Sequence, residues 1–417
     1  MACIGLPALL LTACDLLNRD PPGPSRPPPE KAYRAEILWE REINTSSSIA
    51  RPLIEGQYCY YPARENYPGG DRNIVKINLE ENGRVEWESR GANNSTEYPQ
   101  KIGPYIYLLT FSGFIYVYND SDGKLAATIK LETVMQNNDM YYFTSAAVSG
   151  PYLFWGREDG LMRFDSRLID FSKAPGATQN IAPEQIWSNP PQTRIFADFI
   201  LEDGTLYFIT RYYIYYTSNP DFAPEIPATL IALDAETGDV IWEREAPHCK
   251  GVEDNVLVLN GDKLLVVEAT FSSYDKLTGV PILENIPLGY ERRYYRHDRI
   301  TLYNNRLFYI GDWNLVSVDA DIGKPIWSVS QADIVSGNDE FSSSPLVNNR
   351  QVFILHETGL RVYDAVTGEF IGVDGSFRGK DGVQSSYEVA VYKDAYIFYN
   401  YRLNYVTAIR CKDREEP

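Results

Sequence analysis

A repeated hairpin pattern constrains the fold of this chain more than any other feature of its sequence. Residues 229–243 (TLIALDAETGDVIWE) consist of an alternating apolar strand, a D-A-x-T-G turn and a second strand with Trp near its end. Apolar side chains at every second position predict paired strands, and glycine supplies the positive φ that a tight turn requires. Each copy is therefore predicted to be a β-hairpin. The pattern returns in further segments, more weakly in the last two: 271–284, 315–328, 360–372, 74–88 and 115–129.

A second hairpin precedes each copy, as in 255–267 (NVLVLNGDKLLVV). Two consecutive hairpins form a four-stranded antiparallel blade, and radial repetition of such blades makes a β-propeller. The spacing of the predicted second strands is 43 to 58 residues, close to the ~40–50 residues of known propeller repeats. Eight blades are therefore predicted. The second strands are predicted to begin near Tyr58, Ile106, Tyr152, Leu206, Leu264, Leu307, Val352 and Tyr396.

The last blade lacks a fourth strand, because the chain ends soon after 405–411 (YVTAIRC). Residues 35–43 (AEILWEREI) have the pattern of an outer strand, with Trp39 in the tryptophan position. An N-terminal strand that completes the C-terminal blade would close the ring and remove an open edge. The predicted fold is an all-β, eight-bladed propeller over residues 35–417, with the N-terminal strand closing the last blade.

The N-terminus has the features of a lipoprotein signal. Residues 4–13 (IGLPALLLTA) are apolar and too short for a membrane span of about 20 residues. The run ends in Leu11-Thr12-Ala13-Cys14, which resembles a bacterial lipobox, although no Lys or Arg precedes it. We therefore expect a signal peptide at 1–13 and a lipid on Cys14, followed through residue 34 by a Pro-rich tether with extended backbone. A plain cleaved signal or an incidental apolar start is the alternative.

The charge of the chain limits its partners. With 39 Lys and Arg against 57 Asp and Glu, the net charge is −18, which argues against nucleic acid or an anionic membrane surface as the main partner. Membrane attachment is therefore expected through the lipid alone. The three His residues lie in different predicted blades, without Cys or Glu at ligand spacing, so no metal site is predicted.

The hairpin copies resemble the repeat of the pyrroloquinoline-quinone (PQQ)-type β-propellers, whose consensus combines A-x-D-x-x-T-G with a Trp near the strand end. The resemblance covers roughly residues 35–410 and implies the propeller fold. The family includes quinone-dependent dehydrogenases and the scaffold lipoprotein of the outer-membrane β-barrel assembly machinery, so the resemblance does not choose a function. The matching residues are Asp234, Thr237, Gly238, Trp242, Asp319, Gly323, Trp327, Asp364, Thr367 and Gly368.

Quinone-dependent oxidation is the enzymatic alternative, and the sequence disfavours it. Family dehydrogenases hold Ca²⁺ with Glu, Asn and Asp and carry a disulfide between adjacent cysteines, whereas this chain has no adjacent Cys pair and no acidic cluster that matches the calcium site. The Asp-rich segment 118–123 is interpreted as a hairpin turn. No enzyme activity and no cofactor are predicted. The outer-strand tryptophans are expected to wedge between blades rather than stack on a cofactor; they are Trp39, Trp87, Trp187, Trp242 and Trp327.

Three cysteines, Cys59, Cys249 and Cys411, would remain after maturation besides the lipidated one. Cys59 and Cys411 fall in blades that are ring neighbours in the predicted fold. Two interpretations stay open, a disulfide between them or buried free thiols.

Long insertions gather on one face of the predicted propeller, which favours that face for binding. They lie at 62–73, 210–228, 289–299 and 331–345, whereas the opposite face has short turns except at 165–184. Segment 289–299 interleaves Arg with Tyr, the composition of protein hot spots and of sites for anionic or sugar ligands. A structural role is the alternative, with each Arg paired to a nearby carboxylate. The candidate binding residues are Tyr290, Arg292, Arg293, Tyr294, Tyr295, Arg296, His297, Trp313, Tyr212 and Tyr213.

The leading functional hypothesis is a non-enzymatic binding or scaffold propeller of the bacterial cell envelope, attached by a lipid on Cys14 and expected to be a monomer. Its partner would be an envelope protein that contacts the insertion-rich face. The alternative is a lipoprotein that binds a glycan or an anionic small molecule through exposed aromatic rings and Arg. The expected location is the outer membrane or a periplasm-facing membrane surface.

Overall fold

The computed structural model describes the strands of the propeller and the short turns that join them. The described residues are 35–42, 52–63, 72–92, 96–110, 113–131, 146–157, 160–188, 193–195, 199–212, 228–246, 257–289, 300–311, 314–330, 343–348, 350–356, 359–375, 385–393, 395–400 and 405–410. All structural statements below refer to these residues.

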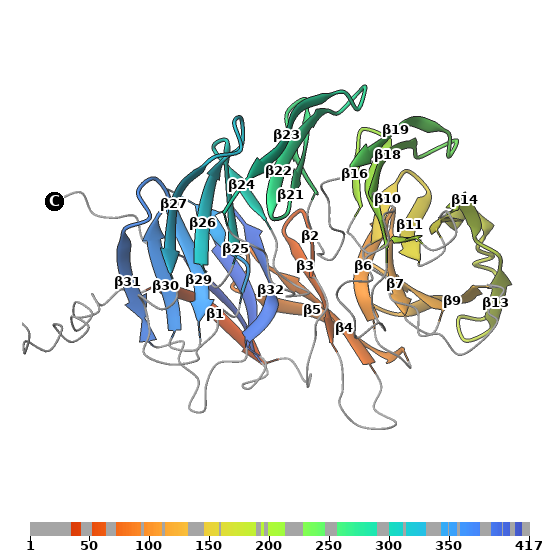
Figure 1. Ribbon diagram of the computed structural model, residues 1–417. Helices are drawn as coiled ribbons and strands as arrows, with labels where there is room; N and C mark the ends of the chain where they lie inside the picture. The colour runs from red at the N-terminus through yellow and green to blue at the C-terminus, as the bar shows by residue number, and fades with distance from the viewer. Residues whose placement is uncertain are drawn as a thin grey trace, which may run out of the picture.

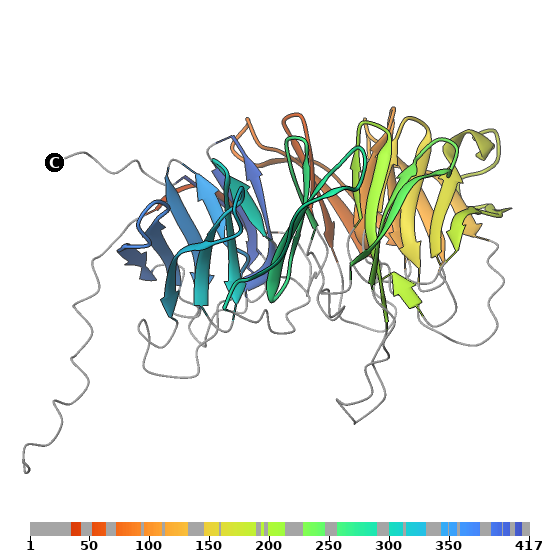
Figure 2. The same cartoon turned by 45° about the horizontal axis from the view of Figure 1, so that its top comes forward.

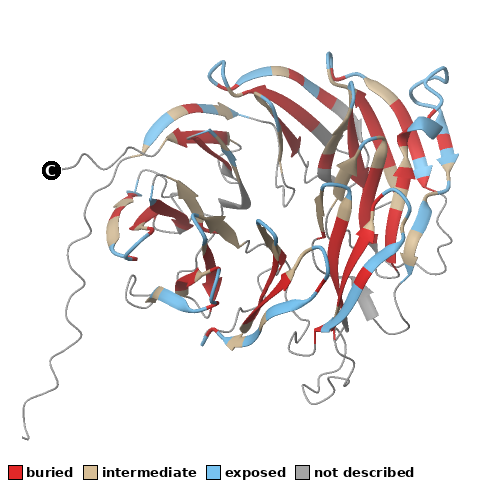
Figure 3. Ribbon diagram, turned by 90° about the horizontal axis from the view of Figure 1, so that it is seen from above, coloured by how far each residue is buried: buried red, intermediate tan, exposed pale blue. Residues whose placement is uncertain are grey.

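Eight antiparallel sheets surround a common axis and form an eight-bladed β-propeller (Figure 1; Figure 3). Blade 1 contains β2 (Leu53–Glu55), β3 (Tyr58–Ala63), β4 (Arg72–Asn78) and β5 (Arg84–Ala92). Blade 2 contains β6 (Thr96–Ile102), β7 (Tyr105–Thr110), β8 (Phe114–Asn119) and β9 (Leu125–Leu131). Blade 3 contains β10 (Ala146–Ser149), β11 (Tyr152–Arg157), β12 (Gly160–Asp165) and β14 (Glu184–Ser188). Blade 4 contains β16 (Ile200–Glu202), β17 (Thr205–Tyr212), β18 (Ala228–Asp234) and β19 (Val240–Ala246).

The remaining blades follow the same order from the innermost to the outermost strand. Blade 5 contains β20 (Leu257–Asn260), β21 (Lys263–Val267), β22 (Thr270–Asp275) and β23 (Pro281–Pro287). Blade 6 contains β24 (Thr301–Tyr303), β25 (Arg306–Gly311), β26 (Asn314–Asp319) and β27 (Pro325–Ser330). Blade 7 contains β28 (Leu346–Asn348), β29 (Gln351–His356), β30 (Gly359–Asp364) and β31 (Phe370–Asp374). Blade 8 contains β32 (Ser385–Tyr392), β33 (Ala395–Asn400), β34 (Tyr405–Arg410) and β1 (Glu36–Glu42).

The N-terminal strand closes the ring, as the sequence predicts. Strand β1 pairs antiparallel with β34 and is the outermost strand of blade 8. The backbone amide of Ala35 also donates a hydrogen bond to Asp374 Oδ2 of blade 7 at 2.8 Å. Blade 8 therefore joins residues from the two ends of the chain.

Two blades contain strands beyond the predicted four. The connection between β12 and β14 includes a short 3₁₀ helix, η1 (Ser166–Leu168), and a strand, β13 (Thr178–Ile181), which pairs parallel with the outermost strand of blade 2. In blade 4, β15 (Thr193–Ile195) pairs with the same strand as β16. The long connection 165–184 thus covers the outer edge of a neighbouring blade.

The core lies between the blades. The second and third strands of each blade are buried on both faces, as in β21, where four consecutive residues from Leu264 to Val267 are buried. The innermost strands are mostly half-buried, and exposed residues gather on the outer strands and in turns (Figure 3). Because each blade packs against two neighbours, its middle strands have continuous apolar runs rather than a strict alternation.

Every blade has a β-bulge at the same position of its outermost strand. In blade 4, Trp242 pairs with Ala232 and Val240 pairs with Leu233, so Ile241 is the extra residue. A bulge bends its strand and redirects the side chains around it. The extra residues of the eight blades are Leu38, Glu86, Ala126, Ile186, Ile241, Ile282, Ile326 and Ile371.

The two faces of the ring differ in their connections. The short turns between first and second strands, and those between third and fourth strands, lie together at the top of the ring in Figure 2. We call this the turn face and the opposite one the loop face.

Within the described part of the chain, no helix is long and apolar enough to cross a membrane.

Candidate functional site

The D-x-x-T-G turns have a common hydrogen-bonding pattern that explains their sequence. Asp234 Oδ1 accepts from the amides of Glu236 at 2.9 Å and Thr237 at 2.7 Å. Gly238 has a φ of +78° and donates its amide to the Asp234 carbonyl at 2.8 Å. The backbone donor from Thr237 is the largest contribution that lowers the pKa of Asp234. Asp275, Asp319 and Asp364 accept from the amides of their own turns in the same way.

Several outer-strand tryptophans join their blade to the turn of the next blade. Trp242 Nε1 of blade 4 donates to the carbonyl of Lys276 in blade 5 at 2.9 Å. The ring also covers Gly279, where a Cβ atom would lie 2.6 Å from Trp242. Any larger residue would therefore push the ring away. Trp87 and Trp327 make the same contacts, with the carbonyls of Asp120 and Ala365 and with Gly123 and Gly368.

Other joints contact the turn glycine in different ways. Trp39 of blade 8 covers Gly83 of blade 1, and Arg41 Nε donates to the Gly83 carbonyl at 2.9 Å. In blade 3, Ile186 rather than Trp187 covers the turn glycine, Gly238. Trp187 instead packs edge-on against Phe208 of blade 4, with ring centroids 5.0 Å apart. All five tryptophans thus lie between blades.

A charged cluster lies at the joint between blades 1 and 2. Lys76 Nζ lies 2.6 Å and Lys101 Nζ 2.9 Å from the Asp120 carboxylate, and the Tyr60 hydroxyl donates to it at 2.6 Å. Burial alone would raise the pKa of Asp120, but these donors outweigh it and lower the pKa. Gly123 N donates to the Asn119 carbonyl at 2.9 Å, so 118–123 ends in a hairpin turn as predicted. Because its carboxylate is neutralised by lysines, Asp120 is a structural residue.

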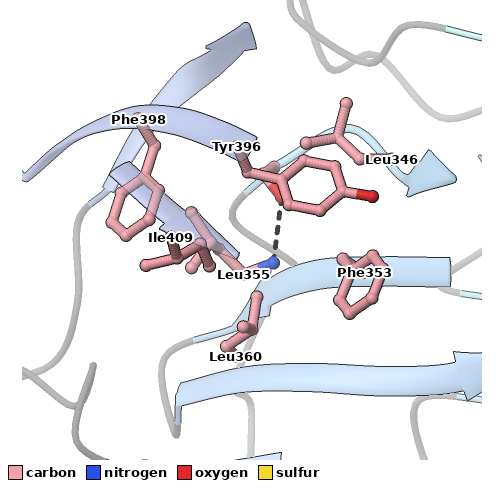
Figure 4. A pocket seen from close by; sticks show the side chains of 8 residues that line it. Leu346, Phe353, Leu355, Leu360, Tyr396, Phe398 and Ile409 are labelled. Atoms are coloured by element: carbon pink, nitrogen blue, oxygen red, sulfur yellow. Dashed lines mark hydrogen bonds between the residues drawn. The ribbon is translucent and has the colours of Figure 1, made fainter. Parts of the chain in front are cut away.

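A small cavity lies between blades 7 and 8 (Figure 4). Its volume is about 10 Å³ and its lining is mostly apolar, with Phe353, Leu360 and Tyr396 among the contributing side chains. The polar contact nearby is the hydrogen bond from the amide of Leu355 to Ser343 Oγ at 3.0 Å. This volume is at the lower limit for one water molecule, so the cavity is a packing gap and holds no organic ligand.

Cys59 is a free cysteine buried in blade 1. Burial raises the pKa of its thiol to about 12, because the thiolate would lose its hydration. Cys249 and Cys411 lie outside the described residues.

The predicted binding residues belong to connections of the loop face. Strand β17 ends at Tyr212, whose backbone pairs with Thr193 of β15. The described strand ends that flank 213–227 and 290–299 lie at the same face of the ring, as the sequence predicts. The side chain of Tyr212 and the other candidates lie outside the described residues: Tyr213, Tyr290, Arg292, Arg293, Tyr294, Tyr295, Arg296, His297 and Trp313. Among the described residues, no group of three or more His, Cys, Asp or Glu could hold a metal ion.

Eight four-stranded blades, several of them joined by a tryptophan over a D-x-x-T-G-type turn, define a PQQ-like β-propeller. Comparison with protein families matches residues 184–415 to the family described as outer membrane protein assembly factor BamB. The match covers more than half of the sequence, and the chain belongs to this family.

Individual relatives are distant. The BamB protein of Yersinia pestis is 24% identical over 187 residues, which cover 43% of this chain and 41% of that protein. The crystal structure of BamB from Moraxella catarrhalis is similar with a TM-score of 0.62 and 12% identity, over 92% of this chain and 100% of that one.

Dehydrogenase structures have the same fold. A europium-containing methanol dehydrogenase matches with a TM-score of 0.61 and 13% identity, over 88% of this chain and 85% of that one. The quinohemoprotein alcohol dehydrogenase of Comamonas testosteroni matches with a TM-score of 0.59 and 12% identity, over 93% and 77% of the two chains. At these identities the similarity shows the fold alone.

Proposed function

We propose that this chain is a non-enzymatic scaffold of the bacterial cell envelope that acts through protein–protein contacts. The family match over residues 184–415 carries the proposal. It begins in blade 3 and extends past the end of β34, so it spans most of the propeller repeats. Membership of a family described as an outer membrane protein assembly factor favours assembly partners over a substrate.

The contacts between blades give the outer-strand tryptophans a structural role, as the sequence predicts. The rings of Trp87, Trp242 and Trp327 cover turn glycines, and their Nε1 groups donate to backbone carbonyls. These residues therefore stabilise the ring of blades.

The loop face is the proposed partner surface. Insertions and aromatic–Arg composition concentrate in its connections, above all in 290–299, and a long surface loop on a rigid scaffold is a common position for binding residues. Arg292, Arg293 and Arg296 are the proposed anchors, because Arg is enriched in protein hot spots.

Cross-linking in the cells that produce this protein, followed by mass spectrometry, tests the partner surface. The test variant carries Arg292→Ala, Arg293→Ala and Arg296→Ala. The matched control carries Arg84→Ala, Lys124→Ala and Arg167→Ala, which remove three exposed basic residues from the turn face. We expect a recurrent envelope protein that is lost in the test variant and retained in the control. Recovery of no envelope protein from the unmodified chain would contradict the proposal.

We further propose that a lipid on Cys14 attaches the propeller to a membrane, with 1–13 removed and 14–34 as the tether. The apolar run at 4–13 and the lipobox-like Leu11-Thr12-Ala13-Cys14 support this. Mass spectrometry of the mature N-terminal peptide should find an acylated Cys14, and Cys14→Ser should release the protein from the membrane fraction. An unmodified Cys14 in the mature protein would refute the anchor.

A further inference from the structure

The outer surface of blades 4 to 7 exposes large apolar side chains near the turn face. Leu277 at the tip of the blade 5 turn is 70% exposed, and the bulge residues Ile241 and Ile282 are each 48% exposed. We call the following set the outer apolar sector: Val240, Ile241, Leu277, Val280, Ile282, Ile322, Ile326 and Val366. Monomeric soluble proteins rarely expose such residues contiguously without a binding role.

The joints between blades bring the elements that carry this set together. The bond from Trp242 to the Lys276 carbonyl joins the strand that contains Ile241 to the turn that contains Leu277. In the same way, the bond from Trp327 to the Ala365 carbonyl joins the strand that contains Ile326 to the turn that contains Val366. Phe271 of blade 5 covers Gly323, which brings the turn that contains Ile322 against blade 5. The sector therefore has members on joined elements of four consecutive blades.

The charged residues around the sector are predominantly acidic. The exposed basic side chains in the outer strands and turns of these blades are Arg244, Lys324 and Arg350. The exposed acidic ones are Asp203, Glu236, Asp239, Glu243, Glu245, Asp262, Glu284, Asp321 and Glu369.

We propose that the outer apolar sector is a second docking surface, whose partner is a polypeptide segment with apolar side chains flanked by Lys or Arg. The inference rests on the proposed scaffold function, because it supplies a second contact at the end of the blades opposite to the loop face. Charge complementarity selects this occupant. A second copy of a chain with net charge −18 and an anionic membrane surface would both be repelled by the acidic border.

The docking mode is side-chain burial in the sector rather than addition of a strand to an outer edge. Strand β23 lies at the centre of the sector and begins and ends with proline, Pro281 and Pro287. Proline offers no amide donor to an added strand. Apolar side chains of the partner would therefore pack on Leu277 and Ile282, while its basic groups would pair with Glu243, Glu245 and Glu284.

Two synthetic twelve-residue peptides test the surface directly. Both have the same leucines and valines, but one carries lysines and the other glutamates. Fluorescence anisotropy with the full mature chain should show at least tenfold tighter binding of the lysine peptide. Binding should weaken at least fivefold in an Ile282→Thr/Ile326→Thr variant, which keeps β-branched residues, and should be unchanged in Ile37→Thr/Val85→Thr, which removes exposed apolar groups from blades 8 and 1. Equal binding of both peptides, or no effect of the Ile282 and Ile326 substitutions, would overturn the proposal.

A photo-cross-linking amino acid at position 277, with position 85 as the control site, tests the occupant in cells. The expected product links residue 277 to a peptide of net positive charge with apolar residues, and Glu243→Lys/Glu245→Lys reduces its yield at least fivefold. A link to a second copy of this chain, to lipid or to an acidic segment overturns the inference. The Arg292, Arg293 and Arg296 substitutions should leave this link intact, so failure of the loop-face proposal and failure of this one are distinguishable.

Discussion

Trp242 of blade 4 and Lys276 of blade 5 are 34 residues apart in the sequence, yet the indole Nε1 donates a 2.9 Å hydrogen bond to the lysine carbonyl. The indole ring covers the glycine of the same turn, so one side chain both packs and hydrogen-bonds across the boundary between blades. Equivalent carbonyls accept from Trp87 and Trp327 at other boundaries. The repeat motif is thus an inter-blade joint, with the turn supplied by one blade and the tryptophan by another.

Trp242 is expected to contribute mainly through packing. Trp242→Ala should destabilise the protein by about 3–5 kcal/mol, because it removes a large buried side chain and leaves a cavity. Trp242→Phe keeps most of the ring and loses the hydrogen bond, so its cost should be nearer ~1 kcal/mol. Urea unfolding followed by circular dichroism measures both, with the exposed Val240→Ala as the control. Equal effects of Ala and Phe would show that the hydrogen bond, not packing, dominates this joint.

A comparison of alanine substitutions at Gly279 and Gly261 distinguishes the cost of a steric overlap from the cost of backbone strain. Both have positive φ, +66° and +62°, but a Cβ at Gly279 would overlap the Trp242 ring, whereas a Cβ at Gly261 meets nothing within 4 Å. Gly261→Ala should therefore cost only the ~1–2 kcal/mol of a left-handed residue. Gly279→Ala should cost distinctly more, because the indole must move. Thermal unfolding of the two variants checks this order, and a reversed order would contradict the joint described here.

Removal of β1 should open the ring. A chain that begins at residue 35 keeps β1 and should unfold at the same temperature as the longer chain. A chain that begins at residue 43 loses the outermost strand of blade 8 and the buried Trp39. Its loss of stability should exceed the ~3–5 kcal/mol of a buried tryptophan truncation. Calorimetry of the two truncated chains measures the difference, and equal melting temperatures would show that blade 8 is stable without its fourth strand.

Asp275 should stabilise the fold at neutral pH but not in acid. The Thr278 hydroxyl and the turn amides donate to its carboxylate and lower its pKa in the folded state. A lowered folded-state pKa contributes stability above the unfolded value of about 3.9, and the contribution is lost as pH falls through the folded pKa. Asp275→Asn should therefore destabilise the protein at pH 7 and pH 5 alike. The difference from the wild type should shrink below pH 4.

Urea unfolding at several pH values measures this difference. Asp262→Asn, in the preceding turn of the same blade, controls for the removal of a surface charge. A difference that grows towards acid pH would contradict the assigned hydrogen bonds.

Sequence periodicity was sufficient to predict the blades. Each of the eight second strands begins at the predicted residue or one residue before it; β3, for example, begins at Tyr58 and β7 at Tyr105. The closing strand around Trp39 was predictable from the same repeat, because residues 35–43 have the pattern of the outermost strand that the predicted last blade lacked. These features are local, because strand alternation and turn glycines depend on neighbouring residues.

The contacts between blades required the tertiary structure. No sequence pattern showed that Ile186 would replace Trp187 over the turn glycine, or that β13 would pair with β9 of another blade. The outer apolar sector was also not apparent, because its members occupy ordinary strand and turn positions and are brought together only by the joints between blades. The four strands of each blade, their tight turns and the number of blades follow from local conformational preference and from the sequence repeat. Which side chains meet across a blade boundary was decided by packing between residues that are distant in the chain.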